Sequence, residues 1–174
     1  MPVLIGKLLK LRALEPQDVE VLYHWENDPE VWEVSHTQTP FSKYLLKTFI
    51  KVAAQDIYTN KQLRMMIDEL QTGKTIGTVD LFDFDPMHDR VGVGILINKD
   101  FREKGYASEA ISLVKTYVFE VLLLHQIYCN ILEENEKSIL LFMKEDFELI
   151  GNKKEWIKTH DGFKNELIFQ CIKK

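Results

Sequence analysis

The chain has 174 residues, which predicts a single domain over residues 1–174 and excludes a two-domain dehydrogenase or a kinase. Hydrophobic residues make up 45% of the sequence and charged residues 28%, so we expect a folded protein with a core rather than a disordered chain. The formal net charge is -5 and no run of basic residues occurs, which argues against binding to nucleic acid or to an anionic membrane.

The sequence before residue 60 predicts one strand followed by two helices. Residues 8–14 alternate loosely between apolar and polar side chains, as a strand does. A helix is expected to begin near Pro16 and to end before the Asn-Asp-Pro of residues 27–29, where an irregular stretch follows. Ser42 is suited to cap the start of a second helix, because apolar side chains between residues 45 and 53 recur at spacings of three and four.

The next segment has the composition of β-strands. Residues 63–70, 75–84 and 91–97 are rich in β-branched and aromatic side chains. Turn-forming residues stand between these runs, at positions 72–74 and 86–89. We therefore expect a three-stranded antiparallel meander.

The last part of the chain predicts two more helices and three more strands. The helical period returns at Ala107, and residues 127–131 read as the strand that follows. A further helix is expected to start at Asn135, with three inward-facing side chains: Ile139, Phe142 and Met143. Strands around residues 154–159 and 165–172 flank an Asp-Gly pair, which is a hairpin signal. This order of elements indicates a mixed α+β domain.

Compartment and metal chemistry can also be judged from the sequence. The apolar runs are far shorter than the ~20 residues that a membrane-spanning helix needs. The N-terminal apolar run carries Lys7, Lys10 and Arg12, unlike a signal peptide, so we expect a cytoplasmic protein. Cys129 and Cys171 lie far apart and the histidines are scattered, which predicts two core thiols, no disulfide and no metal site.

The most informative segment is VGVGILINKDFREKGYASEA, residues 91–110. It predicts a strand, a polar loop and the start of a helix, where unpaired backbone N–H groups and the helix dipole favour a phosphate group. Gly105 and Ala107 allow a ligand to approach the backbone closely. Gly92 and Gly94 inside the strand indicate a bulge or a ligand lying against it. The alternative is that this glycine loop is structural and binds nothing.

Arg102, Gly105 and Ala107 match the motif Q/R-x-x-G-x-G/A of the GNAT superfamily of N-acyltransferases. Further blocks, LRALEPQDV, IGTVDLFDFDP, GYASEA, LHQIY and NEKS, are similar to the branch that holds ribosomal-protein N-terminal acetyltransferases and spermidine acetyltransferases. This resemblance covers nearly the whole chain. It implies an α+β fold with a mixed, mostly antiparallel sheet of about seven strands and about four helices packed on both faces.

The resemblance also implies a binding site for acetyl-CoA. In that fold the fourth and fifth strands splay apart to admit the donor. Asn135 and Ser138 look like a pair that approaches the pantetheine and phosphate groups, although Asn135 serves equally well as a helix N-cap, and the two roles are compatible. The pantetheine arm would lie along Ile95, Leu96 and Ile97, and the pyrophosphate would lie on the backbone of Arg102, Glu103, Lys104, Gly105, Tyr106, Ala107 and Ser108.

Acidic residues on the predicted strand 75–84 and beside it are candidates for the acceptor site. Strand alternation places Asp83 and Asp85 on one face and Asp80 on the other. Asp83 aligns with an acidic residue that lines the acceptor site of spermidine-acetylating relatives, so we expect it to bind the acceptor or to act as a base through water. Asp80 is the second catalytic candidate, whereas Asp85 and Asp89 are at least as well explained as solvated acids.

Two residues depart from the pattern of the relatives. Gly92 stands where many of them have a glutamate as general base, and Phe142 stands where a tyrosine often donates a proton to the leaving thiolate. A phenyl ring has no proton to donate. Either water protonates the thiolate or another residue does so, of which Tyr128 is a candidate.

The resemblance therefore implies an enzyme that transfers an acetyl group from acetyl-CoA to a primary amine by direct attack in a ternary complex, with no metal. The amine belongs to a small molecule, a polyamine or a protein N-terminus. Acids concentrate in residues 26–33 and 80–89, which favours a cationic acceptor, and a homo-oligomer is a further possibility. The alternative is an acyl-CoA-binding module with little or no catalytic activity.

Overall fold

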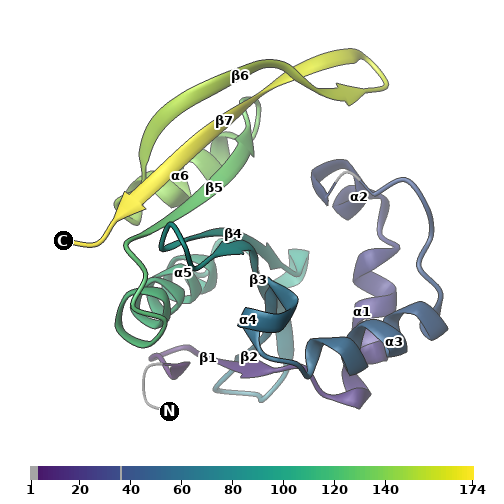
Figure 1. The fold of residues 1–174 in the computed structure, drawn as a ribbon. Coiled ribbons are helices and arrows are strands. Elements are labelled where there is room, and N and C mark those ends of the chain that lie inside the picture. Colours follow the sequence, from purple (N-terminus) through teal and green to yellow (C-terminus); the bar gives the residue numbers. More distant parts are fainter. Residues whose placement is uncertain (1–3, 36) are drawn as a thin grey trace.

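The computed structural model describes residues 4–35 and 37–174. Its centre is a seven-stranded sheet in the order β1-β2-β3-β4-β5-β7-β6 (Figure 1). Neighbouring strands are antiparallel except for β4 and β5, which are parallel. The mixed, mostly antiparallel sheet is therefore confirmed. The strands are β1 (Leu9–Ala13), β2 (Leu63–Glu69), β3 (Thr75–Asp85), β4 (Arg90–Ile97), β5 (Gln126–Leu132), β6 (Glu148–Thr159) and β7 (Gly162–Ile172).

The four predicted helices are confirmed, and two short ones were not predicted. The predicted helices are α1 (Val19–Glu26), α3 (Lys43–Ala53), α5 (Tyr106–Thr116) and α6 (Glu136–Lys144). Ser42 caps α3 as expected, because its Oγ accepts a hydrogen bond from the Leu45 N–H at 3.0 Å. The stretch expected to be irregular contains α2 (Pro29–Ser35), and α4 (Ile57–Asn60) is a single turn capped by Asp56. Shorter turns are η2 (Pro16–Asp18), η3 (Lys99–Phe101) and the π-helical η4 (Tyr117–Val121).

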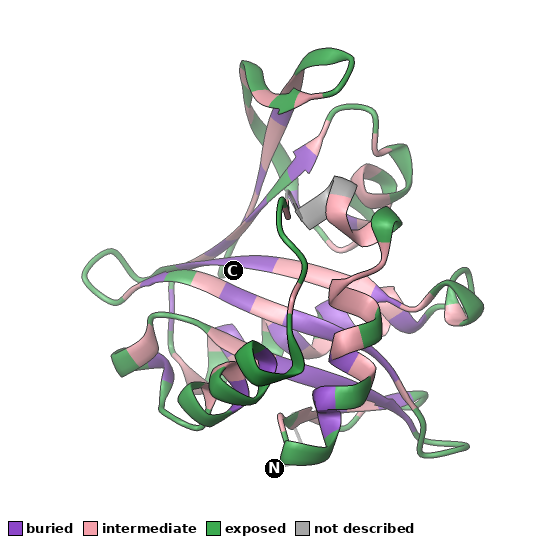
Figure 2. Ribbon diagram, turned by 90° about the vertical axis from the view of Figure 1, so that its right-hand side faces the viewer, coloured by how far each residue is buried: buried purple, intermediate pink, exposed green. Residues whose placement is uncertain are grey.

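Both faces of the sheet are covered, and each covering layer encloses its own core. The larger apolar cluster joins the sheet to α5 and α6, and the smaller one joins it to α1 and α3. Strand β2 contributes Met65 and Ile67 to the first cluster and Met66 to the second, as alternation requires. Buried segments accordingly run along the central strands in Figure 2. In the described part of the chain no helix is long and apolar enough to cross a membrane.

Two details of the predicted elements were wrong. Phe142 of α6 is buried, but Met143 is 57% exposed, because adjacent residues of a helix point about 100° apart and α6 buries one side only. Strand β6 begins at Glu148 rather than near Lys154. Its register with β7 shifts twice, so the apolar alternation that marks a strand is interrupted. Both cysteines are free and buried, as predicted.

Strands β4 and β5 separate after a short paired segment. They pair at Arg90 with Gln126, Val91 with Ile127, and Gly92 with Tyr128. Beyond this point β4 continues beside β3, and β5 continues beside β7. The expected splay between the fourth and fifth strands is therefore confirmed.

A bulge in β3 lies opposite Gly92. The register of β3 with β4 shifts between Phe82 and Asp85, and Asp83 has a φ of 49°. Leu81 and Phe84 both enter the larger core, so the strict alternation on which the sorting of the three aspartates by face rested does not hold here. A side chain at Gly92 would come within 2.3 Å of the Phe82 ring, which explains the glycine.

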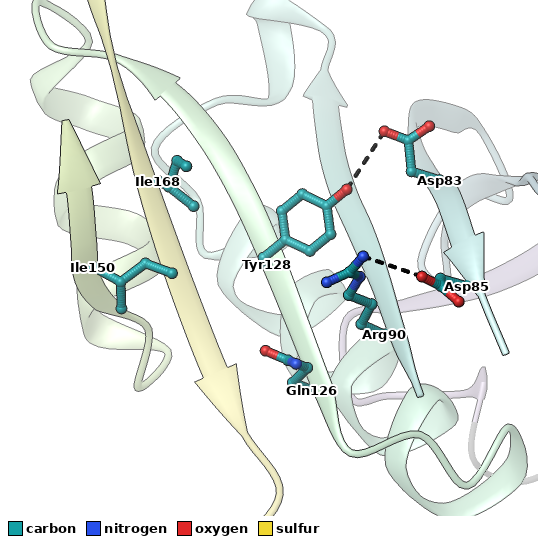
Figure 3. A pocket seen from close by; sticks show the side chains of 7 residues that line it. All are labelled: Asp83, Asp85, Arg90, Gln126, Tyr128, Ile150 and Ile168. Atoms are coloured by element: carbon teal, nitrogen blue, oxygen red, sulfur yellow. Dashed lines mark hydrogen bonds and ion pairs between the residues drawn. The ribbon is translucent and has the colours of Figure 1, made fainter. Parts of the chain in front are cut away.

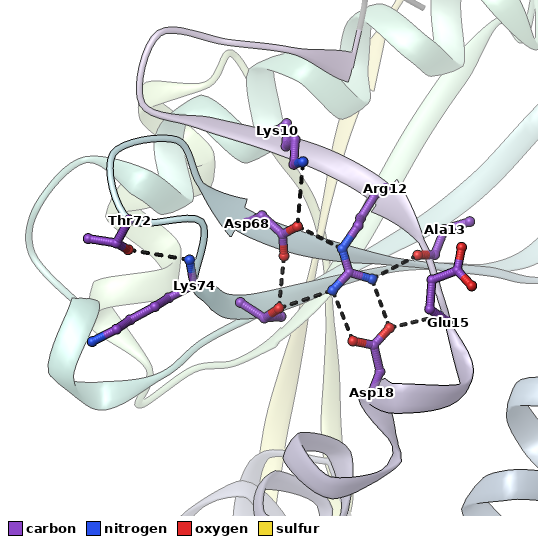
Figure 4. A network of polar contacts seen from close by, with 9 residues as sticks. Lys10, Arg12, Ala13, Glu15, Asp18, Asp68, Thr72 and Lys74 are labelled. Atoms are coloured by element: carbon purple, nitrogen blue, oxygen red, sulfur yellow. Dashed lines mark hydrogen bonds and ion pairs between the residues drawn. The ribbon is translucent and has the colours of Figure 1, made fainter.

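A partly buried cation joins the start of the chain to the sheet (Figure 4). Arg12 on β1 donates hydrogen bonds to Asp18 at 2.8 and 2.9 Å, to Asp68 at 2.7 Å and to Thr75 at 3.0 Å. The bond to Asp18 is the main cause that raises the pKa of Arg12. Burial acts to raise the pKa of Asp18, but the hydrogen bonds from Arg12 and the Glu15 N–H outweigh it and lower that pKa.

We expect Arg12→Met to lower the free energy of unfolding by about 3 kcal/mol near neutral pH, because two buried carboxylates lose their cation. The lowered pKa of Asp18 adds stability above its ordinary value of 3.8, and this stability is lost as the pH falls through the folded value. Urea unfolding from neutral to acid pH should therefore show the gap between the two proteins narrowing. Lys10→Met is the control, since Lys10 is 3.9 Å from Asp68 and half exposed. If the difference in the free energy of unfolding between the two proteins stays constant with pH, the lost stability comes from packing and not from charge.

Candidate active site

The separation of β4 and β5 opens a cleft of ≈ 820 Å³. Its walls come from the end of β4, the loop into α5 with the first turn of that helix, the end of β5 and one side of α6, with Glu30 and Val31 of α2 beside them. Every residue that the sequence predicted for CoA binding lines this cleft except Lys104. The ammonium of Lys104 donates to the Asp100 carbonyl at 3.0 Å and lies over the Phe101 ring, so its side chain is held by the loop.

The β4 wall of the cleft offers an unpaired strand edge. Ile95, Leu96 and Ile97 pair with β3 on one side, but β5 has already moved away on the other. Backbone groups of such an edge require partners, and an extended ligand can supply them. Arg102 is anchored beside this wall, because its Nε donates to the Ile97 carbonyl at 3.0 Å.

The N-terminus of α5 reaches the same cleft without a side-chain cap. Its N-cap is Gly105, whose φ is 86°, and no side chain accepts a hydrogen bond there. By contrast, Ser42, Asp56 and Asn135 each cap their own helix with a side-chain oxygen. The first-turn N–H groups of α5, together with the helix dipole, therefore form a site suited to a phosphate.

Two side-chain hydrogen bonds, one buried and one partly buried, fix this helix start in place. The Tyr106 hydroxyl donates to Glu69 of β2, and the Ser108 hydroxyl donates to Glu145 beyond α6. The bond to Glu69 raises the pKa of Tyr106, while bonds from Thr72 and Tyr106 lower the pKa of Glu69. Both hydroxyls are thus committed to positioning α5.

The opposite wall begins at Asn135. Its Oδ1 accepts a hydrogen bond from the Ser138 N–H at 3.2 Å, so the capping role is confirmed, while contact with a ligand stays a prediction. Lys137 of α6 forms a 2.7 Å ion pair with Glu103 on the facing loop, and this pair lowers the pKa of Glu103. The ion pair connects the two walls of the cleft.

A second pocket of ≈ 400 Å³ lies where β4 and β5 are still paired (Figure 3). Asp83 and Tyr128, two candidates from the sequence, are among its lining residues. Sequence reasoning missed Ile150 and Ile168, which carry no signal beyond that of ordinary strand residues, and also Gln126 and Arg90. The lining residues are Asp83, Asp85, Arg90, Gln126, Tyr128, Ile150 and Ile168.

The carboxylates around this pocket differ in their partners. Asp85 forms a 3.1 Å ion pair with Arg90; burial acts to raise its pKa, but backbone N–H groups and the nearby cations lower it. Asp83 instead accepts a hydrogen bond from the Tyr128 hydroxyl at 3.4 Å. Among the pocket residues that the structure describes, Asp83 is the carboxylate with no cation within ion-pair distance. It is therefore the acid best suited to an incoming ammonium group.

Asp80 has a different environment. It accepts hydrogen bonds from Arg64 at 2.6 and 3.0 Å, and Arg64 also binds Glu26 of α1. Burial acts to lower the pKa of Arg64, but the charges and hydrogen bonds of Asp80 and Glu26 together outweigh this and the pKa is raised. Asp80 does not line either pocket, so its carboxylate is placed to hold α1 against the sheet.

Phe142 offers no proton to either pocket. It is buried in the larger core, where its ring meets Phe147 edge to face at 5.0 Å. No group of three His, Cys, Asp or Glu side chains suited to a metal ion occurs among residues 4–35 and 37–174, and His36 lies outside the described residues.

Comparison with known proteins agrees with this geometry. Residues 9–148 match the family model described as "Acetyltransferase (GNAT) domain". The spermidine N(1)-acetyltransferase of Escherichia coli strain K12 is 26% identical over 164 residues, which cover 94% of this chain and 85% of that protein.

Solved structures show the same fold. The spermidine N-acetyltransferase from Vibrio cholerae in complex with CoA and spermine has a TM-score of 0.87 at 23% identity, and the match covers 96% of each chain. A dodecameric structure of the Vibrio cholerae enzyme in an intermediate state has a TM-score of 0.80 at 22% identity, and covers 96% of this chain and 95% of that one. With most of the sequence matched by the family model, the chain belongs to the GNAT family and is an acetyl-CoA-dependent N-acetyltransferase.

Proposed function

We propose that this enzyme acetylates a primary amine of a polyamine, with acetyl-CoA in the larger cleft and the cationic acceptor at Asp83. Two different sites lie next to each other where β4 and β5 separate, and this observation supports the proposal most strongly. The larger cleft contains the start of α5, which has no side-chain cap and suits phosphate groups. The smaller pocket contains Asp83, a carboxylate that has no cation as its partner among the described residues. The spermidine acetyltransferases among the relatives support a polyamine over a protein N-terminus.

The cleft residues are assigned to the donor. The N–H groups at the start of α5, from Tyr106 to Ser108, would bind the pyrophosphate, with Arg102 and Gly105 shaping the loop before them. The free edge of β4 at residues 95–97 would pair with the amide groups of the pantetheine arm, and Asn135 and Ser138 would face it from α6. Acetyl-CoA supplies an activated acetyl group, and backbone N–H groups near the point of separation would stabilise the charge that grows on its carbonyl oxygen.

Asp83 is assigned to the acceptor. An alkylammonium group has a pKa of about 10, so it must lose a proton before its nitrogen can attack. The Asp83 carboxylate would bind this cation and take the proton directly or through a water molecule. We assign Asp80 a positioning role instead, because Arg64 already neutralises it. We further propose that the enzyme works in the cytoplasm, where acetyl-CoA is available, and as a homo-oligomer, which the dodecameric relative supports.

The function is tested by following thiol release from acetyl-CoA with spermidine, spermine, aminoglycosides and N-terminal peptides as acceptors. We expect acetyl-CoA to raise the melting temperature, since it binds only the folded state, and spermidine or spermine to give the fastest release. Stabilisation without thiol release on any amine would indicate a binding module that does not turn over. Absence of stabilisation would reject the donor site.

Gly105→Ala should raise the KM for acetyl-CoA about tenfold, because a side chain at this positive φ strains the loop that presents the helix start. Gly73→Ala is a matched control: Gly73 also has a positive φ, of 70°, and its Cβ would meet nothing within 4 Å. Both variants should lose similar stability in thermal melts. Equal KM values for the two variants would remove the Gly105 loop from the donor site.

Asp83→Asn should raise the KM for spermidine or lower kcat by about 10²-fold, because the amide neither attracts the cation nor accepts its proton. Acetyl-CoA affinity, measured by calorimetry, should stay nearly unchanged. Asp89→Asn makes the same chemical change at a neighbouring residue of similar backbone conformation, with a φ of 48°, outside the pocket. If Asp89→Asn changed KM or kcat as much as Asp83→Asn does, the change in both variants would come from the lost negative charge of the protein and not from the pocket.

A further inference from the structure

The hydroxyl groups in the described lining of the larger cleft are poorly suited to protonate the departing thiolate. Phe142 is buried and carries no hydroxyl. Among the hydroxyls that line the cleft, Tyr106 donates to Glu69 and Ser108 to Glu145, and neither of these carboxylates belongs to the cleft lining. Ser138 remains, but an alkyl hydroxyl is a much weaker acid than a phenol. A phenol close to the separation of β4 and β5 would fill this role better.

Tyr128 occupies that position. It pairs with Gly92 at the last residue position before the strands part, and its side chain lines the smaller pocket. Gly92 has no side chain, so the Tyr128 hydroxyl reaches across β4 to Asp83 on β3, as Figure 3 shows. The Phe82 ring lies over Gly92 and meets the Tyr128 ring edge to face at 5.9 Å, which fixes the orientation of the phenol.

We propose that Tyr128 is a catalytic residue that replaces the hydroxyl absent at Phe142 and works together with Asp83. The inference rests on the proposed function, because it needs both an acetyl thioester and an amine at the point where the strands part. Asp83 and Tyr128 then bracket the reacting atoms from two strands, one as proton acceptor and the other as proton donor.

The protons balance in this arrangement. The ammonium group gives its first proton to the Asp83 carboxylate, and the free amine forms a C–N bond to the acetyl carbon. As the C–S bond breaks, Tyr128 gives its hydroxyl proton to the sulfur, and the second proton of the nitrogen restores the phenol. Asp83 releases its proton to solvent with the products. The net change is ammonium plus thioester to amide plus thiol plus one proton.

The surroundings of Tyr128 favour a phenol over a phenolate. Burial raises the pKa of Tyr128, and the charge of Asp83 raises it further. Asp85 also acts to raise it, and Arg90 acts to lower it. The hydroxyl therefore stays protonated around neutral pH. A free phenolate is disfavoured, so loss of its proton to sulfur is coupled to the arrival of the proton from nitrogen.

The first test is Tyr128→Phe, which keeps the ring against Phe82 and removes the proton. We expect kcat to fall about 10²- to 10⁴-fold while acetyl-CoA affinity, from calorimetry, stays close to wild type. Tyr44→Phe, at an 82% exposed site on α3, is the matched control and should keep full activity. A kcat for Tyr128→Phe within about twofold of wild type would overturn the proposal.

The second test separates proton transfer from positioning of Asp83. Replacing the residue at position 128 alone by 3,5-difluorotyrosine keeps the hydrogen bond but makes the phenol more acidic. If Tyr128 must be protonated for catalysis, the decrease of kcat at alkaline pH occurs at a lower pH in this protein than in the wild type. If the decrease occurs at the same pH in both proteins, Tyr128 only positions Asp83, and the inference is overturned. Wild-type protein that shows no thiol release with any amine would instead reject the proposed function itself.

Discussion

The parting of β4 and β5 is the constraint on which the rest of this structure depends. Each strand keeps one partner, β3 or β7, and the sides that face each other pair only from Arg90 to Gly92. A sheet normally satisfies its backbone groups by pairing, so this gap leaves an edge that an extended molecule can complete. The connection from β4 to β5 runs through α5, which brings the start of that helix to the same opening.

The acidic residues of this chain differ in whether an arginine side chain pairs with them. Arg12 neutralises Asp18 and Asp68 at the first strand, Arg64 neutralises Glu26 and Asp80, and Arg90 neutralises Asp85. Each of these pairs ties together segments of the fold. Asp83 has a phenol as its partner instead, and it lies on a bulge that turns it out of the regular pleat. The acidic run of β3 is thus divided between structural roles and a pocket.

Much of the fold could be predicted from local patterns, because most elements carry clear ones. The helix beginning after Ser42, the meander of β2 to β4 and the helix beginning after Asn135 have regular periods and capping residues. Helices α2 and α4 were missed since they are short and lack a stripe of apolar side chains. The start of β6 was missed because its bulges interrupt alternation.

The residues of the proposed donor site carry a clearer sequence signal than those of the proposed acceptor site. The proposed donor site lies largely on one continuous segment, where the motif and the helix start coincide, so residues close in the sequence are also close in space. The smaller pocket, proposed for the acceptor, is assembled from β3, β4, β5, β6 and β7, and a bulge lies beside its acidic residues. Ile150 and Ile168 become pocket residues only through the pairing of distant strands. Such a site is set by tertiary structure, which local sequence does not report.

The contact between Phe82 and Gly92 also limits how this sequence can change. A Cβ at position 92 would overlap the Phe82 ring, so a glutamate there is incompatible with this aromatic side chain in its present position. A smaller residue at position 82 would have to come first, and that change would release the ring of Tyr128 from its edge-to-face neighbour. The residues at positions 82 and 92 are therefore coupled, because the side chain at one position limits which side chain the other can carry.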